Sequence, residues 1–106
     1  MTFQMDKVEK FIKKFKFIYS KELEYVFTRG NCYFFAVILR EHFGGDIYYL
    51  PIENHFVCCI GKNFYDITGK IKLMEHPYKW NDYKDFDELD YKRVVRDCLN
   101  FETRKD

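Results

Sequence analysis

Residues 55–69 read His-Phe-Val-Cys-Cys-Ile-Gly-Lys-Asn-Phe-Tyr-Asp-Ile-Thr-Gly, and this stretch decides the fold. Two runs rich in apolar, β-branched and aromatic residues, 55–60 and 64–68, flank a short turn, which predicts an antiparallel hairpin. Glycine suits the first position of a type II′ loop, so we expect Gly61 and Lys62 to form a two-residue turn. In that register one face of the hairpin is wholly apolar and should lie on the core: Phe56, Cys58, Ile60, Tyr65 and Ile67.

The same register decides where two polar side chains meet. Strand side chains alternate between faces, so His55 and Asp66 share one face as diagonal neighbours, close enough to touch. A three-residue loop would instead put Asp66 on the opposite face. A second interpretation is also open, in which Asp66 only bonds the backbone near the turn at Thr68 and Gly69.

The run from Cys32 to Phe43 precedes the hairpin and predicts the central helix of the domain. Its first two turns are apolar on every side, which is typical of a helix buried all round. Asn31 is a good N-cap, and Gly44 and Gly45 form a good C-cap. We therefore expect this helix to pack on a small antiparallel sheet.

Two further helices are predicted before the central one. Apolar side chains recur at helical spacing over residues 5–19, with lysines on the other side. We interpret the lysine side as a solvated face rather than as a docking surface for an anionic partner. Residues 20–28 predict a short second helix capped by Ser20.

The rest of the chain completes an α+β pattern. A strand is predicted over 46–50 and a short one over 71–74. Residues 76–84, which carry the only Trp, read as a loop, and residues 86–101 predict a final helix. The apolar positions of that helix are Leu89, Val94, Val95, Cys98 and Leu99. The predicted fold class is α+β, with helices at both ends of the chain.

The composition of the 106-residue chain limits the classes of function. This length predicts a single domain over residues 1–106. With 18 basic and 17 acidic residues the net charge is +1, which argues against a nucleic-acid-binding module. No apolar run approaches the ~18 residues that predict a membrane span, and the N-terminus lacks the pattern of a secretory signal. We therefore expect a cytoplasmic protein with no membrane partner.

Four cysteines are expected to be reduced thiols in that compartment. Their spacing contains no CxxC pair and no zinc-binding pattern, so neither a metal nor a cofactor is predicted. Cys32 begins the central helix, where the partial positive charge of a helix N-terminus stabilises a nucleophilic thiolate. Cys58, Cys59 and Cys98 lack this setting and are interpreted as core residues.

His55 is the candidate general base for Cys32. A strand packed against the N-terminal end of the helix can bring the imidazole within hydrogen-bond distance of the thiol. His42 lies ~15 Å further along the same helix and cannot meet Cys32. His76 lies in a loop with no partner to be identified from sequence. Asp66 completes a Cys-His-Asp triad, in which it would orient the imidazole and stabilise its cation.

Attack of a thiolate on a carbonyl creates an oxyanion, which two hydrogen-bond donors should hold. The backbone N–H of Cys32 is the natural first donor. Asn31 and Tyr25 are the nearest candidates for the second donor, and the sequence leaves the choice between them open.

Three motifs together resemble a miniature papain-like cysteine hydrolase. They are Gly30-Asn31-Cys32-Tyr33-x-x-Ala36, His55-Phe56-Val57 and Tyr65-Asp66-Ile67-Thr68-Gly69. The pattern is similar to the NlpC/P60, CHAP and transglutaminase-like branches, and to small bacterial and phage proteins with the same core. The resemblance covers about residues 30–69. It implies a papain-like core, in which the cysteine starts a helix and the histidine and its acidic partner lie on consecutive antiparallel strands.

The predicted function is that of a thiol hydrolase or acyl-transfer enzyme, either a peptidase, an amidase, a deamidase or a transglutaminase-like enzyme. It would act on an amide bond of a protein or peptide through Cys32, His55 and Asp66. The alternative is a non-catalytic protein-binding module on the same fold, with the triad unused, as in phage-encoded inhibitors. The sequence predicts neither the particular substrate nor the oligomeric state.

Overall fold

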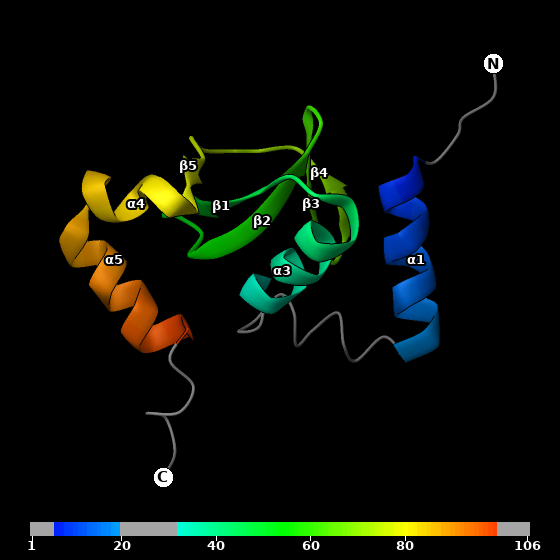
Figure 1. Cartoon of the computed structure of the whole chain (residues 1–106), viewed down its shortest axis with the longest axis horizontal. Coiled ribbons are helices and arrows are strands. Elements are labelled where there is room, and N and C mark those ends of the chain that lie inside the picture. The colour runs from blue at the N-terminus through cyan, green and yellow to red at the C-terminus, as the bar shows by residue number, and fades with distance from the viewer. Residues whose placement is uncertain (1–5, 20–31, 100–106) are drawn as a thin grey trace, which may run out of the picture.

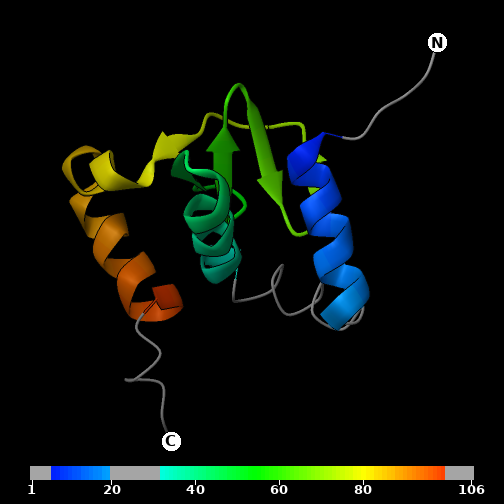
Figure 2. The same cartoon turned by 45° about the vertical axis from the view of Figure 1, so that its right-hand side comes forward.

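The computed structural model describes residues 6–19 and 32–99, and it is an α+β fold with helices packed on an antiparallel sheet (Figure 1). The sheet has five strands in the order β4-β3-β2-β1-β5. The strands are β1 (Asp46–Leu50), β2 (His55–Ile60), β3 (Asn63–Asp66), β4 (Gly69–Ile71) and β5 (Tyr78–Lys79). The helices are α1 (Lys7–Tyr19), α3 (Cys32–Phe43), α4 (Trp80–Phe86), α5 (Glu88–Val94) and the π-helix η1 (Val95–Leu99). Figure 2 shows α3 between α1 and α5.

The hairpin of β2 and β3 has the predicted register. Ile60 pairs with Asn63, and the pairing continues to Cys58 opposite Tyr65. Gly61 adopts a φ of 65°, as the first position of a type II′ loop requires. The predicted apolar face is buried at Phe56, Cys58, Tyr65 and Ile67, while Ile60 is half-buried near the loop. Local turn chemistry and strand alternation are therefore sufficient to fix this part of the fold.

Helix α3 begins and ends as predicted, but it is not buried all round. It lies over β2, so only the side that meets the sheet is enclosed, through Phe35, Ala36 and Leu39. Phe34 is 44% exposed, and Val37 is half-buried. The prediction of a wholly buried helix was wrong because a helix resting on one face of a five-stranded sheet has a free outer side. The predicted N-cap, Asn31, lies outside the described residues.

The C-terminal end of α3 depends on glycine. The N–H of Gly44 donates to the carbonyl of Arg40 at 2.7 Å, and Gly44 and Gly45 both have positive φ. A Cβ atom on Gly45 would lie 2.1 Å from the carbonyl oxygen of Cys59. The chain therefore turns from α3 into β1 through a contact that leaves no space for a side chain.

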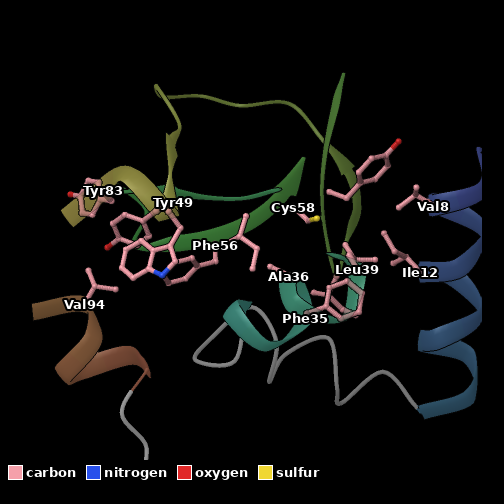
Figure 3. Packing of buried hydrophobic residues seen from close by; sticks show 14 residues of the cluster. Val8, Ile12, Phe35, Ala36, Leu39, Tyr49, Phe56, Cys58, Tyr83 and Val94 are labelled. Atoms are coloured by element: carbon pink, nitrogen blue, oxygen red, sulfur yellow. The ribbon is translucent and has the colours of Figure 1, made fainter. Parts of the chain in front are cut away.

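Helix α1 confirms the predicted amphipathic segment over most of its length. Asp6 and Glu9 form a capping box: the N–H of Glu9 donates to Asp6 Oδ1 at 2.7 Å, and the N–H of Asp6 donates to Glu9 Oε1 at 3.2 Å. Val8 and Ile12 belong to the hydrophobic core (Figure 3). The predicted short helix over 20–28, with its cap Ser20, lies outside the described residues.

The predicted loop over residues 76–84 was wrong, because the segment holds β5 and most of α4. Trp80 is only 8% exposed, and its ring lies 4.9 Å from that of Phe56 in an edge-on contact. Tyr83 is also buried, with its ring 5.2 Å from that of Tyr49. Burial of these large rings stabilises a segment whose local sequence favours neither helix nor strand. The predicted strand over 71–74 is displaced as well, since β4 ends at Ile71.

The predicted final helix is divided into shorter pieces. Asp87, with a φ of −150°, separates α4 from α5, and its side chain caps α5 by accepting the N–H of Asp90. Leu89 was predicted to face the core, yet it is 83% exposed. Val94 lies five residues further along α5, about 140° around the helix from Leu89, and is the residue that is buried. Within the described ranges, no helix has the length and apolar composition to cross a membrane.

Candidate functional site

The hairpin register brings His55 and Asp66 into direct contact. Continuing the pairing by one residue places Val57 opposite Asp66, so His55 is its diagonal neighbour. His55 Nε2 and Asp66 Oδ2 lie 2.8 Å apart, and each side chain is 12% exposed. The other oxygen of Asp66, Oδ1, accepts the N–H of Thr68 at 2.8 Å and also its hydroxyl. Asp66 therefore bonds both the imidazole and the turn, which joins the two interpretations left open by the sequence.

The sulfur of Cys32 reaches the same place from the first residue of α3. Cys32 Sγ accepts the N–H of Phe56 at 3.5 Å, and the sulfur lies near enough to the imidazole to help raise the pKa of His55. Because Asp66 engages Nε2, the ring nitrogen that remains for the sulfur is Nδ1 of His55. The structure thus brings together the three side chains Cys32, His55 and Asp66, and their chemical role stays a prediction.

The short length of β3 explains why a backbone N–H is directed at the sulfur. In a hairpin with a two-residue loop, Ile60 and Cys58 direct their N–H groups toward β3, and by alternation Phe56 does so too. The residue opposite Phe56 would be Ile67, but β3 ends at Asp66 and the chain turns. Cys32 Sγ accepts the N–H of Phe56, which has no partner on β3. This donor was not found from the sequence.

Two opposing effects set the charge of His55. Burial of the ring disfavours the cation and is the largest single influence, but hydrogen bonds to Asp66 and Cys32 and their charges outweigh it. Together they raise the pKa of His55 to about 10. Burial would likewise raise the pKa of Asp66, yet hydrogen bonds from His55 and Thr68 hold it below its usual range. The pair therefore consists of an imidazolium and a carboxylate at neutral pH.

A pocket of about 340 Å³ opens beside the His55–Asp66 pair. Its apolar walls come from the end of β1, from the end of β4 and from the segment after β4: Leu50, Ile71, Leu73 and Met74. Glu53 and Lys72 also line it and are its other charged groups. The carboxylate of Glu75 joins the two walls, since it accepts the N–H groups of Ile52 at 2.8 Å and Glu53 at 2.9 Å.

The other cysteines and histidines are not among the side chains that meet at this site. Burial raises the pKa of the Cys58 thiol to about 11 and also raises that of Cys59. The side chain of Cys98 lies outside the described residues. His42 stacks on a phenylalanine of α1, and His76 packs edge-on against Tyr78 at 4.7 Å. Within the described ranges no group of three side chains is arranged to hold a metal ion.

The predicted oxyanion donors are only partly described. The N–H of Cys32 belongs to the first turn of α3, whose N–H groups have no partner within the helix itself, so it suits the role of first donor. The two candidates for the second donor, Asn31 and Tyr25, both lie outside the described residues.

The described structure defines an α+β protein in which a helix-terminal cysteine meets a His-Asp pair on neighbouring strands. A family model for phage YunG-like proteins matches residues 4–105, and the chain belongs to this family. No curated protein and no solved structure matches the chain. The family description names no activity, so the resemblance to papain-like cysteine hydrolases stays a prediction made from the motifs.

Replacing Asp66 by Asn is expected to lower the free energy of unfolding at pH 7 by about 2 kcal/mol, because a hydrogen bond between charged groups is lost. The folded pKa of Asp66 is depressed, so its stabilisation is present above the unfolded pKa of ~3.9 and is lost as the pH falls through the folded value. The difference between wild type and Asp66→Asn, measured by urea unfolding, should therefore shrink from pH 5 to pH 2. The control is Asp46→Asn, which removes a half-exposed carboxylate 3.8 Å from Lys79. An equal difference at both pH values would contradict the expectation.

Proposed function

We propose that this protein is a cytoplasmic cysteine-dependent hydrolase or acyl-transfer enzyme that acts on an amide bond of a protein or peptide. Cys32 is the nucleophile, His55 carries the proton, and Asp66 orients the imidazole. The observation that supports this most is that two contacts meet at His55: its ring lies 2.8 Å from Asp66 Oδ2, and the Cys32 sulfur accepts the N–H of the next residue, Phe56. A nucleophile, a base and an orienting group in this order are what acyl transfer requires.

In the acylation step, His55 takes the proton of the Cys32 thiol, and a cationic imidazole beside the sulfur favours the thiolate. The N–H of Phe56 supports the same charge on Sγ. The sulfur attacks the carbonyl carbon and a C–S bond forms, while the carbonyl electrons move to the oxygen. When the intermediate collapses, the C–N bond breaks, and the imidazolium gives its proton to the leaving nitrogen. The products are a thioester on Cys32 and a free amine.

In the second step, the neutral imidazole takes a proton from water or from an acceptor amine, which attacks the thioester carbon. The C–S bond then breaks, and the sulfur leaves as a thiolate beside the imidazolium, so the starting state is restored. Water gives net hydrolysis, and an amine gives net transfer. Asp66 holds Nε2 throughout and stabilises the ring when it is charged.

Alkylation of the native protein across pH tests whether Cys32 is such a nucleophile. The thiolate fraction of an ordinary thiol rises roughly 200-fold between pH 6 and pH 9, because its pKa is ~8.5. For Cys32 we expect the rate with iodoacetamide to rise less than about fivefold over the same interval. Mass spectrometry of each cysteine gives the rates, and the ratio of the two rates cancels differences in access.

The variant His55→Gln should return Cys32 to the steep pH dependence of an ordinary thiol. Cys59, which is half-buried on the same strand, provides an internal reference in every sample. A native Cys32 that follows the same pH dependence as Cys32 in urea would overturn the proposal. It would leave the alternative, in which the protein binds a partner and the triad is unused.

A further inference from the structure

The turn that delivers His55 is held in an uncommon backbone conformation. Residues 51–54 connect β1 to β2, and the last of them, Asn54, directly precedes His55. Asn54 has a φ of 53°, and in the described part of the chain it is the only residue other than glycine with positive φ. Asparagine tolerates this left-handed region better than most residues, but it still needs support from its surroundings. What holds Asn54 therefore bears on where the imidazole lies.

The side chain of Asn54 is anchored at two points. Asn54 Oδ1 accepts the hydroxyl of Tyr49, a fully buried residue of β1. It also lies 3.4 Å from a terminal nitrogen of Arg93, which donates to it and to the Tyr49 hydroxyl oxygen at 3.1 Å. The guanidinium of a C-terminal helix thus reaches across to the turn before His55.

Arg93 is itself fixed before it reaches the turn. Its Nε donates to Asp90 Oδ1 at 2.8 Å, and the other oxygen of Asp90 accepts the hydroxyl of Tyr83 at 2.6 Å. Tyr83 is buried against Tyr49, and Figure 3 shows the two rings beside each other. Hydrogen bonds from Arg93 and Tyr83 hold the pKa of Asp90 below its usual range, so the carboxylate stays charged. A guanidinium with a fixed orientation loses little freedom on binding a second partner.

We propose that Arg93 is a positioning residue for His55. By holding Asn54, it keeps the turn in the conformation that places the imidazole between Asp66 and Cys32. At the preceding residues of the turn, the carboxylate of Glu75 accepts the N–H groups of Ile52 and Glu53, so the turn is held by side chains from two other segments. This inference rests on the proposed function, since it concerns the group that would carry the proton.

The test compares Arg93→Gln with Arg96→Gln in the full-length protein. Arg96 lies one turn further along the chain and is exposed. In the described part of the chain, its guanidinium bonds to the carboxylate of its neighbour Asp97. The measured quantity is the ratio of the iodoacetamide rates of Cys32 at pH 9 and pH 6. We expect this ratio to stay below about five in the wild type and in Arg96→Gln. In Arg93→Gln it should be about ten times the wild-type ratio. Slow labelling of the buried Cys58 reports that each variant is folded.

A second substitution separates positioning from general support of the fold. Asn54→Gly keeps positive φ accessible but removes the oxygen that Arg93 holds. If Arg93 acts through Asn54, then Asn54→Gly alone raises the ratio, and adding Arg93→Gln changes it no further. This variant also serves if Arg93→Gln alone does not fold. An Asn54→Gly protein with the wild-type ratio would overturn the inference, and so would an Arg93→Gln effect that is undiminished in the Asn54→Gly background. A steep ratio in wild type itself would instead refute the proposed function.

Discussion

Replacing Cys32 by Ser is expected to lower hydrolysis and acyl transfer by about 10⁴-fold or more, because a serine hydroxyl does not ionise in a site built for a thiolate. The assay uses a complex peptide mixture in water enriched in ¹⁸O. Hydrolysis of an amide places one ¹⁸O in each new carboxylate, and added hydroxylamine intercepts the thioester as a hydroxamate. Both products are identified by mass, so the substrate need not be known beforehand.

The matched control is Cys59→Ser, which makes the same chemical change at a half-buried thiol of β2. It should leave both products at the wild-type level. Cys32→Ser is nearly isosteric, so the free energy of unfolding should change by less than ~1.5 kcal/mol. Products that persist undiminished in Cys32→Ser would exclude Cys32 as the nucleophile.

Replacing Leu39 by Ala is expected to have the opposite profile. Leu39 is fully buried in α3 at the centre of the core, so the cavity should cost about 2–5 kcal/mol in free energy of unfolding. Even the lower value shifts the folding equilibrium roughly 30-fold. The flat pH dependence of Cys32 alkylation should survive at low temperature, where the variant remains folded, because Leu39 lies about two helical turns beyond Cys32 in α3.

The control for Leu39→Ala is Leu89→Ala, which removes the same atoms from an 83% exposed side chain of α5. Its free energy of unfolding should lie within ~0.5 kcal/mol of the wild type. Thermal and urea unfolding of the two variants side by side give the comparison. Equal melting temperatures for both would mean that α3 does not form the centre of the core.

The parts of the fold that were predictable are those whose information is local. Glycine at position 61 selects the loop, the loop sets the register, and the register decides that Asp66 lies beside His55. The same holds for the ends of α3, where glycines at 44 and 45 mark the stop. In each case a few neighbouring residues determine the backbone, so distant parts of the chain do not have to be known.

The C-terminal half was harder because its structure depends on contacts between distant residues. Trp80 packs on Phe56, which lies in β2. Residues 76–84 by themselves carry no pattern that predicts this contact. Leu89 and Val94 lie on different sides of α5, and only the packing of α5 against the rest of the fold decides that Val94 is the buried one. Arg93 bonds residues 39 and 44 positions away, so its role could not be predicted from sequence spacing.

The site was predictable in its side chains and not in its backbone. Cys32, His55 and Asp66 were found because their residue types and positions on helix and strand are informative. The N–H of Phe56 was missed because every residue except proline carries one, and only the end of a neighbouring strand makes it available. The residues after Asp66, Ile-Thr-Gly, were the available signal, since they turn the chain away from β2.

The length of β3, four residues, determines which backbone groups of β2 remain available to the Cys32 sulfur. If two more residues extended this strand after Asp66, every side chain would keep its face and the sheet would gain a rung. That rung would reclaim the N–H of Phe56 and exclude the sulfur of Cys32 from its place. A longer β3 and the Cys32 sulfur therefore compete for the same N–H group. A longer β3 would add a backbone pair to the sheet and would remove a hydrogen bond from the Cys32 sulfur, whereas at the other end of the hairpin the length of the loop fixes the register.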